Sequence, residues 1–295
     1  MSDGGRRGVD WLCEDQTTGV RLCLRLKERL VRRRTAFQQL ELVDTAEHGR
    51  VLALDGKVML SERDEPFYHE MLVHPAMFAH PAPRRVLVVG GGDGGTLREV
   101  LRHPSVEQAV LVEIDAEVVE VCREHLQAVH QGAFDDPRTQ VVVAPGEGFM
   151  PRQAGTFDVI LVDSTDPIGP GQALFTTGFF RATRRALREG GLVAMQAGTP
   201  FYWPHELTEA VDLIAELFPH LGVYLGFVPT YPAGMWAYVL AGLRDVRAEG
   251  RHLAERFAAR GVPTRYYTPH LHRAAFTLPR FLEELLPHAA GGHRP

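Results

Sequence analysis

The chain has 295 residues, of which 45% are hydrophobic and 23% are charged, as in ordinary globular proteins. The formal net charge of −5 argues against a nucleic-acid partner and suits cationic ligands. No apolar run approaches the roughly 18 residues of a membrane span, and the N-terminal stretch lacks a signal-peptide core. We therefore expect no membrane partner and a cytoplasmic location.

The cysteines are Cys13, Cys23 and Cys122. Their number is odd, and none are spaced as C-x-x-C. This pattern predicts neither a disulfide frame nor a zinc site.

The stretch from residue 20 to residue 62 consists of short, β-like apolar runs. The pair Asp55-Gly56 separates two of these runs and is typical of a hairpin whose turn needs positive φ. The basic run over residues 25–34, RLKERLVRRR, allows a nucleic-acid interpretation, but in an acidic chain we favour a solvated face. We predict an antiparallel β domain over residues 1–65 and a second domain over residues 66–295.

A helix is expected to begin near Pro66, because proline is favoured at the first helical position. Its first turn carries Tyr68 and His69. Such a pair is commonly structural, but here it stands just before a glycine-rich segment. We therefore expect this turn to line the same cleft as the glycines.

From residue 84 onward, predicted strands alternate with predicted helices. The strands cover residues 86–90, 109–114, 139–144, 157–163 and 192–196, and the helices cover residues 97–102, 116–126, 179–187 and 206–218. Runs 223–229 and 236–243 have no helix between them and predict an antiparallel hairpin at one edge of the sheet. Helices over residues 247–259 and 279–286 follow. The fold class is therefore α/β, with a Rossmann-like, mostly parallel sheet.

The segment over residues 86–100, VLVVGGGDGGTLREV, joins a buried strand to a helix through five glycines and Asp93. Gly90, Gly92 and Gly95 have the G-x-G-x-x-G spacing, and Glu113 ends the next apolar run. This arrangement is typical of a nucleoside-binding loop whose acid binds ribose hydroxyls.

Ligands of an open parallel sheet bind at the carboxyl ends of its strands. Successive strand ends carry Asp93, then Glu113 and Asp115, then Glu147, then Asp163 and Asp166, then Gln196, with Tyr231 before the hairpin turn. Asp115 precedes a helix, and we interpret it as a cap. Asp163 and Asp166 precede a Pro/Gly-rich loop, so capping does not explain them.

Crowded carboxylates repel one another unless a cation enters between them. No His or Cys cluster of metal spacing lies among these positions, so organic cations suit the cleft better than a metal. A sulfonium nucleoside and an amine would satisfy both features.

The chain resembles the spermidine synthase (polyamine aminopropyltransferase) family. The resemblance runs from about residue 51 to residue 286 and is carried by LDGKVMLSERDEPFYHE, VLVVGGGDGGTLREV, VEIDAEVV, FDVILVDSTDPIGP, LF at 174–175, VPTYP and RAAFTLPRFL. It implies an N-terminal β domain beside a class I methyltransferase-like domain. The implied reaction moves an aminopropyl group from decarboxylated S-adenosylmethionine to an amine, commonly putrescine, giving spermidine and 5′-methylthioadenosine.

The resemblance also implies roles for particular residues. Glu113 would hold the ribose, Asp93 the aminopropyl ammonium, and Asp163 would accept the proton. The remaining donor contacts would come from Gly91, Gly92, Glu147, Gly148, Pro170 and Met59. The amine site would be lined by Tyr68, His69, Asp163, Asp166, Gln196 and Tyr231, with Tyr68 also catalytic. It implies no cofactor besides the co-substrate, no metal, and a homodimer or homotetramer.

Two positions depart from the family pattern. Met59 stands where Gln is common, and Glu147 stands where Asp is common. We interpret both residues as tolerated sequence drift rather than as the sign of an altered donor or acceptor preference.

Other functions remain open at this stage. A methyltransferase that uses S-adenosylmethionine shares the fold, although Asp93 would repel the donor's carboxylate. A polyamine- or nucleoside-binding protein without catalysis is a second alternative. A nicotinamide oxidoreductase is a distant third, because no hydride-handling site accompanies the glycines.

Overall fold

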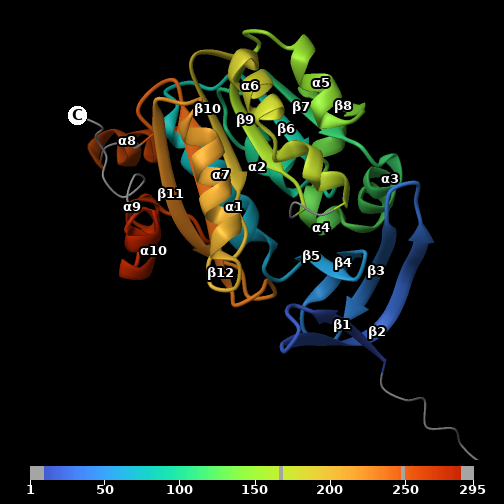
Figure 1. Cartoon of the computed structure of the whole chain (residues 1–295). Coiled ribbons are helices and arrows are strands. Elements are labelled where there is room, and N and C mark those ends of the chain that lie inside the picture. Colours follow the sequence, from blue (N-terminus) through green and yellow to red (C-terminus); the bar gives the residue numbers. More distant parts are fainter. Residues whose placement is uncertain (1–9, 166–168, 247–249, 287–295) are drawn as a thin grey trace, which may run out of the picture.

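The computed structural model describes residues 10–165, 169–246 and 250–286. The predictions that fall on residues 1–9, 166–168, 247–249 and 287–295 lie outside the described residues. Two sheets organise the described chain, a five-stranded one near the N-terminus and a seven-stranded one after it (Figure 1).

The N-terminal sheet is antiparallel throughout, in the order β1-β2-β3-β4-β5. Its strands are β1 (Trp11–Asp15), β2 (Arg21–Arg34), β3 (Gln39–Thr45), β4 (Gly49–Leu54) and β5 (Lys57–Ser61). The turn between β4 and β5 has φ of 48° at Asp55 and 78° at Gly56, which confirms the predicted hairpin. The basic run lies on β2 as a largely solvated strand, where Arg33 reaches Glu117 and Glu120.

The expectation that the cysteines form no disulfide is wrong. Cys13 and Cys23 are bonded, and they lie directly opposite each other on β1 and β2 with Cα atoms 4.1 Å apart. Directly opposed residues at non-hydrogen-bonded positions of an antiparallel pair approach to about 4.5 Å, which suits a disulfide. The register of two strands decides this contact, and the spacing of the cysteines in the sequence carries no sign of it. Cys122 is free and buried.

The larger sheet has the order β11-β12-β10-β9-β6-β7-β8. Its parallel strands are β6 (Arg85–Gly90), β7 (Gln108–Glu113), β8 (Thr139–Val143), β9 (Phe157–Asp163) and β10 (Leu187–Gln196). The hairpin of β11 (His220–Phe227) and β12 (Met235–Gly242) adds to β10 in antiparallel fashion, as predicted. The predicted α/β fold class, with an antiparallel hairpin at the sheet edge, is confirmed.

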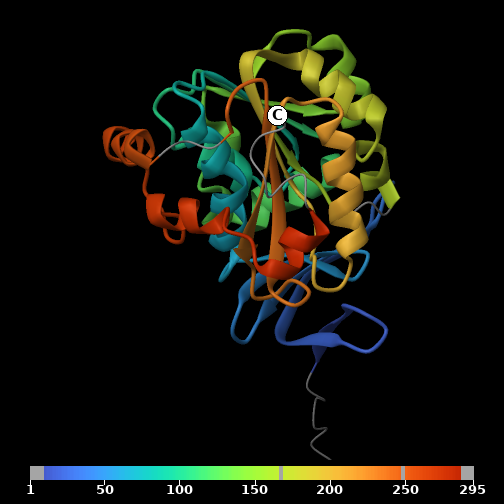
Figure 2. The ribbon, with the colours of Figure 1, turned by 60° about the vertical axis from the view of Figure 1, so that its left-hand side comes forward.

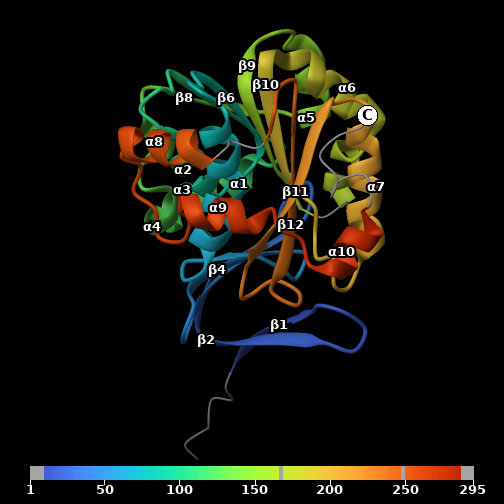
Figure 3. The same cartoon turned by 90° about the vertical axis from the view of Figure 1, so that its left-hand side faces the viewer.

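Helices cover both faces of the larger sheet, so its central strands are buried on both sides and consist of apolar runs, whereas the edge strand β8 is only partly buried. Figure 3 shows the sheet nearly edge-on, with α1 (Glu65–Ala79), α2 (Gly95–Leu101), α8 (Gly250–Arg260) and α9 (Pro269–Ala275) on one side. On the other side lie α6 (Thr177–Ala186), α7 (Pro204–Ala215) and α10 (Arg280–Leu285), as the intermediate view in Figure 2 also shows. The remaining α-helices of the described residues are α3 (Ala116–His125), α4 (Gln127–His130) and α5 (Gly146–Phe149). Two buried hydrophobic clusters, one on each face of the larger sheet, form its core.

Helix α1 connects the two sheets and begins with Pro66 in its first turn, as predicted. Almost all of its residues are buried, because it packs against the larger sheet, α2 and α8. The domain boundary between residues 65 and 66 stays a prediction. Within the described residues, no helix is both long enough and apolar enough to cross a membrane.

Candidate active site

A cavity opens at the carboxyl ends of β6, β7 and β9, where the N-terminal sheet faces the larger one. The residues that line it come from both sheets and from α1: Gln38, Leu52, Leu54, Met59, Tyr68, His69, Val89, Gly90, Gly91, Gly92, Asp93, Val112, Glu113, Ile114, Val118, Gly146, Glu147, Asp163, Ser164, Thr165, Gly171, Leu174 and Tyr231. This is the edge at which parallel sheets bind ligands.

The glycine loop after β6 is shaped by its close approach to β9. Gly91 has φ of +67°, and its N–H donates to the carbonyl oxygen of Asp163 at 2.8 Å. A Cβ at Gly91 would lie 2.7 Å from Oδ2 of Asp163, and one at Gly92 would lie 3.1 Å from Glu113. Any larger residue would therefore push the loop away from both carboxylates.

Glu113 ends β7 and is 9% exposed. Its Oε1 accepts a hydrogen bond from the N–H of Asp115 at 3.0 Å. Burial disfavours the charged carboxylate more than this bond favours it, and the pKa of Glu113 rises to about 7. A ligand hydroxyl that donates to Glu113 would stabilise its ionised form.

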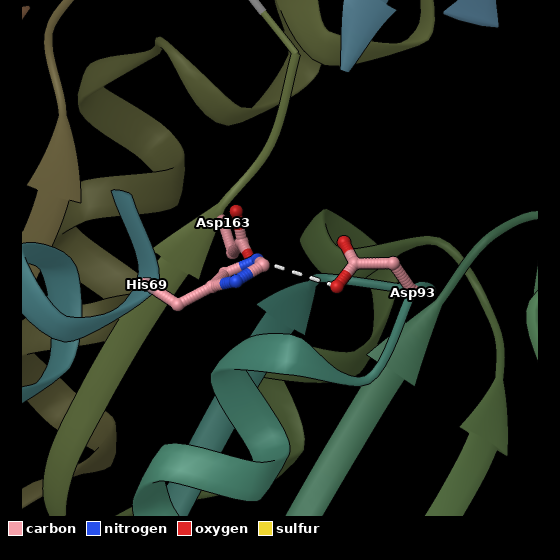
Figure 4. Close-up of side chains that lie close together, drawn as sticks. All are labelled: His69, Asp93 and Asp163. Atoms are coloured by element: carbon pink, nitrogen blue, oxygen red, sulfur yellow. Dashed lines mark ion pairs between the residues drawn. The ribbon is translucent and has the colours of Figure 1, made fainter. Parts of the chain in front are cut away.

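Asp93 and His69 form an ion pair inside the cavity (Figure 4). The imidazole of His69 lies between two carboxylates, with Nε2 at 3.3 Å from Asp93 and Nδ1 at 2.6 Å from Glu65. Arg98 on α2 makes two hydrogen bonds to Glu65, at 2.9 and 2.8 Å, and so holds it in place. Gly95 allows this approach, because a Cβ there would overlap the His69 ring.

The charges of these groups follow from their neighbours. Burial alone would lower the pKa of His69, but the charges and hydrogen bonds of Asp93 and Glu65 outweigh it and raise the pKa to about 10. The imidazolium in turn lowers the pKa of Asp93, in spite of its burial. His69, Asp93 and Asp163 have side-chain atoms within 4.8 Å of one another, a spacing that could hold a metal ion. A protonated imidazole has no lone pair for a metal, so this trio suits an organic cation better.

Asp163 ends β9 and faces the phenol of Tyr68. The Tyr68 hydroxyl donates to Oδ1 of Asp163 at 2.8 Å. Burial and the nearby charge of Asp93 raise the pKa of Asp163, although the side chain keeps some exposure to solvent. Burial and the Asp163 charge likewise hold the pKa of Tyr68 far above its ordinary value, so the phenol keeps its proton.

A second cavity continues from the first and shares five of its residues: Met59, Tyr68, Ser164, Thr165 and Tyr231. Its remaining lining is Glu14, Lys57, Val58, Gln196, Trp203, Pro232 and Trp236. The Tyr231 hydroxyl donates to the carbonyl oxygen of Met59 at 2.5 Å, and Trp236 packs edge-on against Tyr231. The carboxylate of Glu14 and the aromatic faces together make a lining that suits an alkylammonium chain.

Most of the predicted residues meet here. The first cavity contains Met59, Tyr68, His69, Gly91, Gly92, Asp93, Glu113, Glu147, Asp163 and Tyr231, and the second adds Gln196. Gly148 is exposed and is not among the lining residues. Asp166 lies outside the described residues, and of Pro170 only the backbone is described, in the short 3-10 helix Gly169–Leu174. Asp115 caps α3 by accepting from the N–H of Glu117, which confirms its assignment as a cap.

Sequence reasoning missed several lining residues. Gln38 donates to Asp115 at 3.0 Å and lines the first cavity, and Glu14 and Trp203 line the second cavity. Gln38 lies beside β3 and Glu14 lies on β1, in a part of the sequence that shows only strand patterning. Contacts between the two sheets bring them to the site, and nothing in their local sequence indicates it.

Comparisons with known proteins agree with this geometry. The family model for the spermine/spermidine synthase domain matches residues 65–247, and that for the spermidine synthase tetramerisation domain matches residues 10–62. The polyamine aminopropyltransferase of Clostridium tetani is 42% identical, over 94% of this chain and 97% of that protein. That of Shouchella clausii is also 42% identical, over 94% and 98% of the two chains.

Solved structures give the same result. A spermidine synthase in complex with the transition state analogue AdoDATO has a TM-score of 0.92 at 39% identity, covering 97% of this chain and 98% of its own. The spermidine synthase from Thermotoga maritima has a TM-score of 0.88 at 38% identity, covering 97% of each chain. The fold and the site thus define a transferase of the Rossmann-like class. The chain belongs to the spermine/spermidine synthase family, and it is an aminopropyltransferase of polyamine biosynthesis.

Proposed function

We propose that the chain transfers the aminopropyl group of decarboxylated S-adenosylmethionine to a diamine, with putrescine as the preferred acceptor and Asp163 as the proton acceptor. The products are spermidine and 5′-methylthioadenosine. One observation carries the proposal: Asp93, in the loop after β6, and Asp163, at the end of the neighbouring strand β9, both line the first cavity, and Tyr68, which donates to Asp163, lies at the junction with the second cavity. Two carboxylates at such a junction suit one cation from each side.

The donor occupies the first cavity. Glu113 accepts hydrogen bonds from the ribose, and the glycine loop at Gly91 and Gly92 lets the nucleoside approach the main chain. Glu147, which lines this cavity, is on the adenine side. Asp93 binds the ammonium of the aminopropyl group. Its partner His69 is itself cationic, so it orients Asp93 and limits the excess negative charge of the site.

The acceptor occupies the second cavity, where Gln196 and Tyr231 line its chain and Tyr68 orients Asp163. A free alkylamine has a pKa near ~10.4 and is protonated at neutral pH, so it has no lone pair for attack. Asp163 accepts that proton, and its raised pKa favours the transfer. The nitrogen lone pair then forms a bond to the carbon beside the sulfonium, and the electrons of the broken C–S bond stay on sulfur as a neutral thioether.

Two residues depart from the family pattern. The Tyr231 hydroxyl donates a hydrogen bond to the main-chain oxygen of Met59. This bond does not depend on the side chain at position 59, so a Gln is not needed there. Glu147 is exposed at the rim of the first cavity, where one additional methylene can be accommodated. We propose that both are tolerated drift.

The test is an assay of decarboxylated S-adenosylmethionine with a panel of putrescine, cadaverine, diaminopropane, agmatine and spermidine, with the products identified by mass spectrometry. We expect spermidine and 5′-methylthioadenosine with putrescine preferred. Asp163→Asn should bind the donor as wild type does and lose at least about a hundredfold in kcat. Wild-type turnover in Asp163→Asn would refute its role as the proton acceptor.

The match to a tetramerisation domain over residues 10–62 supports a homotetramer, with a homodimer as the alternative. We propose that the N-terminal sheet supplies the contact. Light scattering of the intact chain distinguishes the two states. A monomer at micromolar concentration would contradict both.

A further inference from the structure

Lys57 places a positive charge in the wall of the second cavity. It is one of only two lysines in the chain and begins β5, directly after the Asp55-Gly56 turn. Its ammonium lies 3.5 Å from Oε1 of Glu14 and donates to the carbonyl oxygen of Asp15 at 2.5 Å. A cavity proposed to bind a cationic acceptor therefore already contains a cation.

Glu14 is a fixed partner in this pair. Its side chain is 5% exposed, and Oε2 accepts a hydrogen bond from the N–H of Val58 at 3.0 Å. Strand β1, which carries Glu14, is anchored as well, because Gln16 directly after it donates to the carbonyl oxygen of Thr230 at 3.1 Å. Lys57 is the mobile partner, since 45% of its side chain is exposed and its stem is flexible.

The position of the pair relates it to the acceptor. Glu14 and Lys57 line the second cavity but not the first, whereas Tyr68, which donates to Asp163 where the reacting amine would lie, lines both. Trp203 and Trp236 line the same part of the second cavity with their indole rings, and Tyr231 lines both cavities. The far ammonium of a bound diamine therefore approaches Glu14, where it meets the ammonium of Lys57.

We propose that Lys57 is a resident counter-ion of Glu14, which the far ammonium of the acceptor has to displace, and that this competition sets the affinity for diamines. The inference rests on the proposed function of the second cavity as the acceptor site. Like charges near one carboxylate disfavour each other, so each ammonium weakens the binding of the other. Lys57 thus determines how strongly the enzyme selects acceptors by the charge at their far end.

The experiment compares wild type with Lys57→Met, which keeps an unbranched apolar stem and removes the charge. Exposed ion pairs are weak, so we expect the KM for putrescine to fall about two- to fivefold, with kcat unchanged. Lys27→Met is the matched control: Lys27 pairs with Asp44 at 3.3 Å on the N-terminal sheet and lines neither cavity. It should leave KM unchanged.

Two further comparisons separate charge from shape. Butylamine has no far ammonium, so its inhibition constant should be the same for wild type and Lys57→Met. In a Glu14→Gln background, Lys57→Met should no longer lower the KM for putrescine. An unchanged or higher KM in Lys57→Met, an equal gain for butylamine, or the same gain without Glu14 would each overturn the proposal.

A failure of the proposed function can be distinguished from a failure of the role proposed for Lys57. If wild type transfers no aminopropyl group to any amine, that function fails. Calorimetric titration of putrescine into each variant, with 5′-methylthioadenosine present, then still compares the affinities. Equal affinities of wild type and Lys57→Met would refute the role of Lys57.

Discussion

Asp93 offers the sharpest test of how the donor is chosen. Its Oδ1 accepts from the N–H of Gly95 at 2.7 Å and lies 3.3 Å from Nε2 of His69. Asp93→Asn keeps an acceptor for Gly95 and removes the negative charge. The loop should therefore keep its shape, and the change reports on charge alone.

The expected size follows from Coulomb's law. A donor ammonium about 4 Å from the carboxylate gains roughly 4 kcal/mol at an effective dielectric constant of about 20, and a donor carboxylate at that position loses a similar amount. Desolvation and the positive charge of His69, 3.3 Å from Asp93, offset part of each value. We therefore expect Asp93→Asn to weaken decarboxylated S-adenosylmethionine by about 10- to 100-fold, and to weaken full S-adenosylmethionine much less.

Isothermal titration of both donors into wild type and Asp93→Asn measures this difference. The ratio of the two dissociation constants should move toward one in the variant. An equal loss of affinity for both donors would show that Asp93 does not select against the carboxylate. Thermal unfolding of both proteins controls for a general loss of structure.

Two further predictions concern the loop and its neighbours. The pKa of Glu113 rises from its usual 4.5 to about 7 in the folded chain, so the folded state holds the proton more tightly and this group's stabilisation is lost as the pH rises through about 7. The unfolding free energy of Glu113→Gln relative to wild type should therefore increase by about 3 kcal/mol from pH 4.5 to above pH 7. Urea titrations at several pH values measure this difference. A difference that stays constant with pH would contradict the raised pKa of Glu113. Gly95→Ala should lower kcat by about ten- to a hundredfold, because its Cβ displaces the His69 ring. Gly19→Ala is the matched control, with open space around the added Cβ, and wild-type turnover in Gly95→Ala would show that the contact with His69 is dispensable.

Local patterns in the sequence were sufficient for the architecture. The Asp55-Gly56 turn, Pro66 at the start of α1 and the alternation of strands and helices each depend on residues close together in the chain. Because parallel strands end at one edge, the same alternation placed Asp93, Glu113 and Asp163 around one cavity.

Tertiary structure decided the properties that depend on distant neighbours. Cys13 and Cys23 are bonded because β1 and β2 pair in one particular register. The same hairpin carries Glu14 to the second cavity, where Lys57 meets it.

The charge state of the site has the same origin. His69 remains cationic because Glu65 holds one ring nitrogen and Asp93 the other, and Arg98 on α2 fixes Glu65 from behind. The sequence by itself determined which residue types reach the sheet edge, because the alternation of strands and helices and the residue that ends each strand are local properties of the chain. Their pairing and their pKa values required the packing of α1 against α2, because burial and Coulomb interactions depend on distances in space.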